Sequence, residues 1–283
     1  MINEIKSGTS DQKWLEYGID QIPIYLNKED TDKRVLAKNG KFVAVVGKHY
    51  RVLPNELALS LADESAKLSN LTPATGILDH AMGHGGMEWF GDTKHAIKNK
   101  WKLHAFYDTG REITVGDTGV KVGVAVHNSI DGSTGFNVGI FTFRFICSNA
   151  VFVGFKGSSF QGQTLDYLYG RHTVGLGNLI NQLQEKMVGI MDKAHFIVDA
   201  YEQMDRVKAS EELVKKIRAS RISDKILPDY MKTEELVLND LSEWEVYNDL
   251  TEAIWHSKQI NIDTKITYFD QLHRVMPLVP RSV

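Results

Sequence analysis

Hydrophobic and polar residues follow two different patterns along the chain. From residue 41 to about residue 174, short runs of β-branched and aromatic residues are separated by glycines, which is typical of antiparallel strands joined by turns. From about Gly175 to Met204, apolar residues recur at helical spacing, which indicates a long amphipathic helix. We therefore predict an α+β fold. Residues 1–174 are expected to form an antiparallel, β-hairpin-rich sheet with packed helices. Residues 175–283 are expected to form a helical region with an extended C-terminal tail.

The clearest predicted hairpin joins "VKVGVAVHN" to "FNVGIFTFRFICSN" through "SIDGSTG", in which Asp131-Gly132 favours a turn. Side chains alternate across a strand, so one face of the second strand carries Phe141, Phe143 and Phe145. The opposite face combines Arg144 with isoleucines and a threonine. A buried guanidinium is costly without a partner, so we expect Arg144 to meet either an internal carboxylate or a phosphate group of a ligand.

Three further helices are predicted from their start signals, after a polar leader that precedes residue 41. Pro54, with Asn55 as N-cap, begins a helix that runs through "ELALSLADESAKL". A second helix covers "SEELVKKIRAS", and a third begins at "LSEWEVYNDLTEAIWHSKQ", where Ser242 and Glu245 have the spacing of a capping box. Prolines at positions 277 and 280 indicate that the chain ends in an extended tail.

Charge is distributed unevenly, although the net charge of the chain is only −3. Between Lys94 and His172 there are nine basic residues against five acidic ones, whereas acidic residues are in excess from Asp199 to Glu252. Such asymmetry accompanies nucleic-acid binding or head-to-tail self-association, and an ordinary solvated surface is the alternative. The polar N-terminus and the lack of a long apolar run favour a cytoplasmic protein with no membrane segment, located in the host cytoplasm if a phage encodes it.

The common catalytic and metal-binding signatures are missing from the sequence. It lacks a phosphate loop, an H-E-x-x-H zinc motif, a G-x-S-x-G elbow and a calcium loop, and its single cysteine excludes a cysteine-rich zinc site. His80 and His84 have helical spacing, but glycines around them argue against a helix. We interpret them, with His95 and His104, as surface or hairpin-tip residues. We expect neither a metal nor a cofactor.

A basic and aromatic segment, "KHAIKNKWKLHAFYD", is the main candidate site. It interleaves four lysines with three aromatic residues: Lys94, Lys98, Lys100 and Lys102 with Trp101, Phe106 and Tyr107. Proteins that bind single strands use this combination, because lysines track phosphates and aromatic rings stack on bases at roughly 1–3 kcal/mol per base. The alternative is an exposed strand whose lysines discourage edge-to-edge aggregation and whose tryptophan faces the core.

The stretch "VHNSIDGSTGFNVGIFTFRFICSNAVFVG", followed by "RHT" at residues 171–173, resembles the phage and plasmid family known as domain of unknown function 932. The motif residues that carry the resemblance are Asn128, Ser129, Asp131, Gly132, Arg144, Cys147, Asn149 and His172. "VVGKHYRVLPNE" and "WEVYNDLTEAIWH" are similar to the family's flanking patterns, so the resemblance spans residues 40–260. Ala150 departs from the pattern, since a glycine is expected after the asparagine.

Through this family, the chain looks similar to single-strand annealing proteins of the RecT and Red-beta kind. That similarity implies a phage-type, ATP-independent recombination protein that binds single-stranded DNA, promotes strand annealing and forms a homo-oligomeric ring or filament. The basic residues expected to contact phosphates are Lys94, Lys98, Lys100, Lys102, Lys156 and Arg171. Arg144, Asn149 and His172 are expected to form an inner anchoring cluster, and Trp101 and Tyr107 to stack on bases.

Two other functions fit the same residues. One is an enzyme that processes nucleic acid or nucleotides, with His172, Asn149 and Asp131 converging in a polar site where the histidine acts as general base. The other is a phage regulatory or host-interaction protein that uses its acidic helices as a docking face. The sequence alone does not choose between these alternatives.

Overall fold

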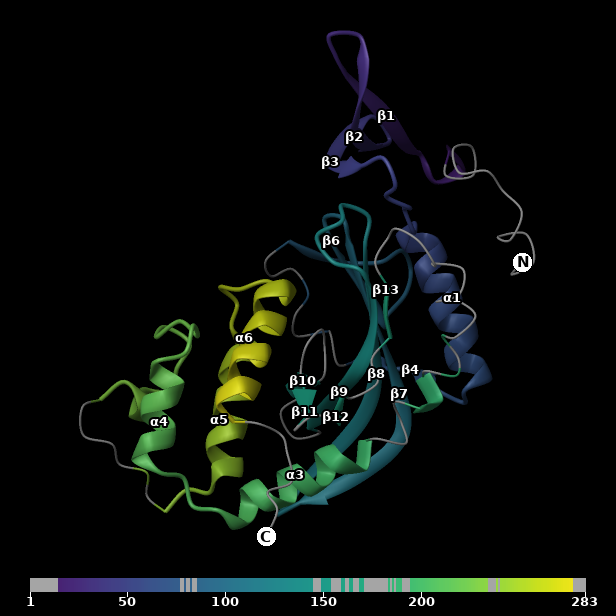
Figure 1. The fold of residues 1–283 in the computed structure, drawn as a ribbon. Helices are drawn as coiled ribbons and strands as arrows, with labels where there is room; N and C mark the ends of the chain where they lie inside the picture. The colour runs from purple at the N-terminus through teal and green to yellow at the C-terminus, as the bar shows by residue number, and fades with distance from the viewer. Residues whose placement is uncertain are drawn as a thin grey trace.

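The computed structural model describes residues 15–76, 79, 82, 86–144, 149–153, 159–160, 163–164, 168–170, 183, 185, 187–189, 194–233, 238 and 240–276. Within these ranges, helices flank a large antiparallel sheet on two sides, and a small antiparallel sheet projects beyond one end of it (Figure 1). The predicted α+β class is therefore confirmed.

Three long strands form the centre of the large sheet. They are β7 (Lys102–Val115), β8 (Thr118–Ser129) and β9 (Phe136–Arg144), and the last two form the hairpin predicted from the sequence. The short strands are β4 (Thr72–Pro73), β5 (Met87–Trp89), β6 (Ala96–Asn99), β10 (Asn149–Val153) and β13 (Leu168–Gly170), with β11 (Ser159–Phe160) and β12 (Gln163–Thr164) as a separate pair. The strand order is β10-β9-β8-β7-β6-β5, with β13 paired to β9 and β4 paired to β7.

The small sheet has the order β1-β2-β3 and lies before the first helix. Its strands are β1 (Ile19–Leu26), β2 (Glu29–Lys38) and β3 (Lys41–Gly47). Of these three strands, the sequence predicts only β3. The prediction that the residues before position 41 form a polar leader is wrong for residues 19–38, which form β1 and β2. The strand signal is weak in both: Pro23 interrupts β1, and β2 has apolar residues only at positions 35–37. The sheet covers a small core, which consists of Ile19, Leu36, Val43, Val46, Val52 and Ile130.

Helices cover the large sheet from two sides. α1 (Asn55–Leu68) packs on β7 and β8, and Figure 1 shows it across the sheet from α5 (Glu243–His256) and α6 (Ile262–Val275). α3 (Ala194–Arg206) contacts β7 and α5, and α4 (Glu211–Arg218) contacts α6. The short 3-10 helices are η2 (Leu15–Tyr17) and η4 (Asp229–Met231).

The predicted helix starts have different outcomes. The capping box of α5 is present, because Ser242 accepts a hydrogen bond from the Glu245 N–H and the Glu245 carboxylate accepts one from the Ser242 N–H. The N-cap prediction for Asn55 is wrong: Pro54 holds that position, and the Asn55 side chain makes a long-range contact instead. Residues 262–275, for which the sequence predicts no helix, form α6.

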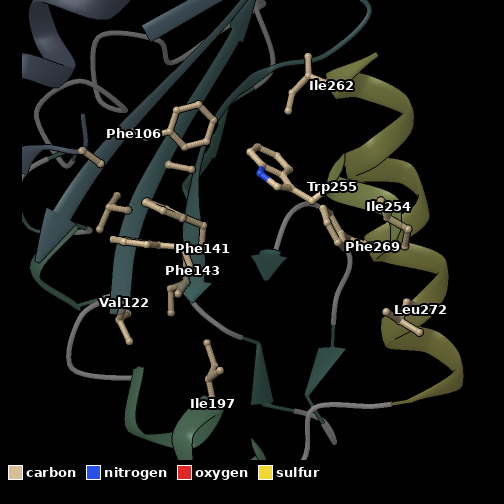
Figure 2. Packing of buried hydrophobic residues seen from close by; sticks show 14 of the residues in the cluster. Phe106, Val122, Phe141, Phe143, Ile197, Ile254, Trp255, Ile262, Phe269 and Leu272 are labelled. Atoms are coloured by element: carbon tan, nitrogen blue, oxygen red, sulfur yellow. The ribbon is translucent and has the colours of Figure 1, made fainter. Parts of the chain in front are cut away.

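Aromatic side chains join the sheet to the C-terminal helices. Figure 2 shows Phe106 on β7 and Phe141 on β9 directed towards Trp255 of α5, and all three rings are buried. Phe141 and Phe143 stack with their ring centroids 5.6 Å apart, which confirms the aromatic face predicted for these two residues; Phe145 lies outside the described residues. The same hydrophobic cluster includes residues on both sides of position 174, so sheet and helices share one core.

Candidate nucleic-acid interface

The predicted basic segment lies at one edge of the large sheet, on β6, the start of β7 and the turn between them. Two of its lysines form ion pairs: Lys98 Nζ is 2.9 Å from Glu88 Oε2 on β5, and Lys102 Nζ is 3.1 Å from Asp263 Oδ1 on α6. Lys94 and Lys100 are exposed, and neither forms an ion pair with another described residue. Of the four lysines in this segment, these two have no ion-pair partner among the described residues, and Lys94 Nζ lies 5.0 Å from the centroid of the Trp89 ring.

The two predicted stacking residues have different environments. Tyr107 is completely buried, and its hydroxyl donates a 2.7 Å hydrogen bond to Asp63 on α1. A ring in that position is inaccessible to a base, so we correct the expectation that Tyr107 stacks. Trp101 is half-buried: it packs against the small core, as the alternative expects, and part of the residue remains exposed.

Arg144, at the end of β9, meets an internal carboxylate. Its Nη2 is 3.1 Å from Glu252 Oε2 on α5, and its side chain is 13% exposed. Asn149 faces Arg144 across the β9–β10 pair. Lys156, Arg171 and His172 lie outside the described residues, so their roles remain predictions.

The motif between β8 and β9 builds a turn and anchors α1. Asn128 Nδ2 donates 2.8 Å hydrogen bonds to the Asn55 Oδ1 and to a backbone carbonyl just before α1. Ser129 Oγ donates to the Thr134 carbonyl at 2.7 Å, and Asp131 Oδ1 accepts from the Ser133 N–H at 2.9 Å. The motif therefore stabilises the turn and holds the start of α1 against β8. The Asp131 carboxylate accepts hydrogen bonds within its own turn.

Three segments that are distant in the sequence meet at Ile130. The Ile130 N–H donates to the Trp101 carbonyl at 3.0 Å, and the Tyr50 hydroxyl donates to the Ile130 carbonyl at 3.2 Å. The half-buried residues Tyr50 and Trp101 are thus both bonded to one residue. Exposed basic residues flank them along the chain: Lys48, His49, Arg51 and Lys100. We call these four basic residues, together with Tyr50 and Trp101, the basic junction.

Lys100 and Trp101 are predicted from the sequence as site residues, but the other four residues of the basic junction are not. Their signal is the run "GKHYR", in which cations surround an aromatic ring. Lys48 Nζ is 2.5 Å from Asp32 Oδ1, and that hydrogen bond lowers the pKa of Asp32. Both partners are solvent-exposed, so water and salt screen the pair. Burial raises the pKa of Tyr50, which keeps its phenol neutral as a hydrogen-bond donor.

A pair of histidines is buried between the central strands and α6. His104 and His127 face each other across β7 and β8 and share an Nδ1···Nδ1 hydrogen bond. His104 Nε2 is 3.7 Å from Asp263 Oδ1, and burial lowers the pKa of His104 to about 4. Burial also lowers the pKa of His127. Both rings are therefore neutral at pH 7 and belong to the interior.

The surface interpretation of the histidines is wrong wherever the structure describes them. His104 is 2% exposed and His95 is 8% exposed. The His95 Nε2 is 2.9 Å from Asp63 Oδ1, on the α1 side of the sheet. His80 and His84 lie outside the described residues. In the part of the chain that is described, no three His, Cys, Asp or Glu side chains are grouped so that they could hold a metal ion.

Comparisons with known proteins identify the family of the chain but no activity. None of the described helices is both long enough and apolar enough to span a bilayer. Searches of curated proteins and of solved structures gave no match. A family model described as "Domain of unknown function (DUF932)" matches residues 43–272, which is most of the chain. The chain therefore belongs to the domain of unknown function 932 family.

Proposed function

We propose that the protein binds single-stranded DNA through the basic junction. The observation that carries this proposal is the meeting of residues 48–51 and 100–101 at Ile130, which puts four exposed basic residues beside two aromatic rings. Cations that follow the phosphates and rings that contact bases are the two elements of sequence-tolerant single-strand binding. The resemblance to annealing proteins extends the proposal to phage-type, ATP-independent strand annealing by a homo-oligomer.

Lys94 and Lys98 extend the proposed path along the sheet edge. Lys98 sits on β6, close in sequence to Lys100, and its partner Glu88 has a side chain that is 68% exposed. A phosphate can compete for a lysine in such a pair, because exposed ion pairs contribute little stability. Lys102, Arg144 and Tyr107 are not part of the interface that we propose, since the first two have partly buried acidic partners and the third is buried.

The first test is the salt dependence of binding, measured by fluorescence anisotropy with a labelled single-stranded oligonucleotide. Binding releases counterions, so the affinity should fall with salt, and the slope of log K against log salt should decrease by about 0.7 for each phosphate that a variant no longer neutralises. We expect the double variant Arg51→Ala/Lys100→Ala to bind more weakly and with a smaller slope. Lys216→Ala is the matched control, since Lys216 is an exposed lysine on α4, away from the basic junction.

Absence of binding at low salt, or equal weakening in the control, would exclude the basic junction as the DNA site. Annealing is tested separately, by mixing complementary strands that carry a fluorophore and a quencher, without ATP. Particle images with and without single-stranded DNA test the homo-oligomer. Binding without faster annealing or assembly would leave a single-strand-binding protein and remove the recombination role.

A further inference from the structure

The outer strand of the small sheet has an unused backbone edge. β3 pairs with β2 only, and no other described residue forms a backbone hydrogen bond with residues 42–46. An outer strand presents a row of N–H and C=O groups on which another strand can pair. β3 therefore offers a template for an added strand.

The opposite edge of the same sheet contains a proline, whereas β3 does not. β1 contains Pro23, which has no N–H and so cannot donate to an added strand. β3 reads "KFVAVVG", with β-branched residues at three of its seven positions, and each of its residues has an N–H. The register with β2 shifts in both edge strands, between Pro23 and Tyr25 in β1 and opposite Leu36 and Ala37 in β3. The missing N–H of Pro23 is therefore the feature that makes β1 the poorer edge for an added strand.

An exposed apolar row crosses the sheet and ends at β3. Ile22 on β1 lies opposite Val35 on β2, which lies opposite Val45 on β3. Ile22 is 51% exposed and Val45 is 53% exposed, and Phe42 on the same strand is 64% exposed. Figure 1 shows the sheet projecting from the body of the molecule, so this row lies apart from the large core. Exposed apolar surface of this kind marks a site of protein interaction.

The charges at the ends of β3 indicate which charged residues a partner strand would carry. Lys41 begins the strand, Lys48 follows it, and Lys33 lies opposite Gly47 on β2. Lys48 is paired with Asp32, so Lys33 and Lys41 carry the charge at the two ends of the edge. Antiparallel pairing of two copies centred on Ala44 would bring Lys41 of each copy opposite Gly47 of the other, whose neighbour on β2 is Lys33. Like charges at both ends disfavour that dimer, whereas carboxylates at the ends of a partner strand would be attracted.

The first two strands also lie outside the matched family region. The match begins at Val43, so β1 and β2 precede it, and they place Ile22 and Lys33 beside β3. These two strands nevertheless form one sheet with β3, so residues outside the matched region help to shape its edge.

We infer that β3 binds an extended segment of a partner protein by strand addition. The segment carries apolar side chains at alternate positions, which pack on Phe42 and Val45, and Asp or Glu residues at its ends, which pair with Lys33 and Lys41. Backbone hydrogen bonds supply affinity in this mode, and alternate side chains supply specificity. β3 adjoins the basic junction at Lys48, but the inference rests on the backbone edge and apolar row of the small sheet and does not depend on DNA binding.

A synthetic peptide tests the inference on the full-length protein. The probe is a labelled peptide of about nine residues that alternates valine with threonine between aspartates, a length typical of strands. We expect saturable binding by anisotropy and slower hydrogen exchange of the backbone amides of residues 42–46. The double variant Phe42→Asp/Val45→Asp should weaken binding about tenfold or more, as is usual when central apolar side chains are removed from an interface. Leu68→Asp, at a residue 58% exposed on α1, is the control and should bind normally.

Three results would overturn the inference. The first is equal binding of a peptide with the same charge in which prolines replace the central threonines, because attraction between charges alone would then explain it. The second is binding without protection of residues 42–46 in hydrogen exchange. The third is a wild-type dimer in sedimentation that Phe42→Asp/Val45→Asp converts to monomer, since the edge would then serve a second copy of the chain.

Discussion

At the scale of single residues, Arg144 forms an ion pair with a carboxylate that is distant in the sequence. Its guanidinium is 3.1 Å from the Glu252 carboxylate, and the two residues are 108 positions apart in the sequence. The side chain of Arg144 is 13% exposed and that of Glu252 is 46% exposed, so the pair lies at the border of the interior. Of the two partners that the sequence predicts for Arg144, the structure contains the internal carboxylate.

Arg144→Met is expected to lower the free energy of unfolding by about 1–2 kcal/mol, because the pair is only partly desolvated. Urea unfolding measures this change, and a double-mutant cycle with Glu252→Gln isolates the interaction between the two side chains. Binding of single-stranded DNA should be unchanged. A large loss of binding with unchanged stability would instead make Arg144 a ligand contact.

The buried histidine pair predicts a dependence of stability on pH. The pKa of His104 is about 4 in the folded chain and 6.5 at its ordinary value. As the pH falls below 6.5, the unfolded chain takes up a proton that the folded chain does not. The contribution of His104 to the free energy of unfolding should therefore fall by up to about 3 kcal/mol between pH 6.5 and about pH 4 and stay constant at lower pH. Chemical unfolding at a series of pH values measures this change in the free energy of unfolding.

His104→Gln should flatten this pH dependence, whereas His256→Gln, at an exposed histidine at the end of α5, should leave it as in the wild type. Equal slopes in His104→Gln and wild type would show that the neutral pair does not link folding to pH. His127 contributes in the same direction, because burial also lowers its pKa. Some pH dependence should therefore remain in the single variant.

At the scale of elements, the β8–β9 hairpin depends on one glycine that local sequence does not explain. A Cβ at Gly123 would lie 2.2 Å from the Phe141 ring and 2.7 Å from the Tyr107 carbonyl oxygen. The Phe141 ring therefore occupies the space above β8 that a side chain would fill. The sequence predicts the hairpin from alternation and the Asp131-Gly132 turn, but the contact is visible only when strands are paired.

Gly123→Ala is expected to destabilise the protein by about 2 kcal/mol, because the added methyl group overlaps an aromatic ring in a packed core. Gly47→Ala is the control, since no atom lies within 4 Å of its added Cβ. Thermal unfolding of both variants provides the comparison. A Gly123→Ala protein as stable as the control would mean that the Phe141 ring moves at little cost.

At the scale of the whole molecule, the chain has one large core and one small core. The large core joins the sheet to α3, α5 and α6, while the small core lies between β1–β3 and the end of the large sheet. The basic junction lies beside the small core, because Tyr50 and Trp101 pack against it. Net charge does not reveal this surface, since it sums basic and acidic residues over all elements of the chain.

Features that depend on neighbouring residues can be predicted from the amino-acid sequence alone. Alternation and turn chemistry give the β8–β9 hairpin, and the spacing of Ser242 and Glu245 gives the start of α5. The same local rules miss β1, β2 and α6. Pro23 weakens the strand signal of β1, and polar residues dominate β2. The start of α6 has a local signal, the N-cap Asn261, that the prediction overlooked.

The partners of buried polar residues, by contrast, are set by the packing of the folded chain. Asn55 meets Asn128, His104 meets His127 and Arg144 meets Glu252, and each pair joins segments that are distant along the chain. Such contacts follow from how sheets and helices pack, which periodicity does not specify. A buried polar group must find a partner, but its own neighbours in sequence do not reveal which one, because packing brings the partner from elsewhere.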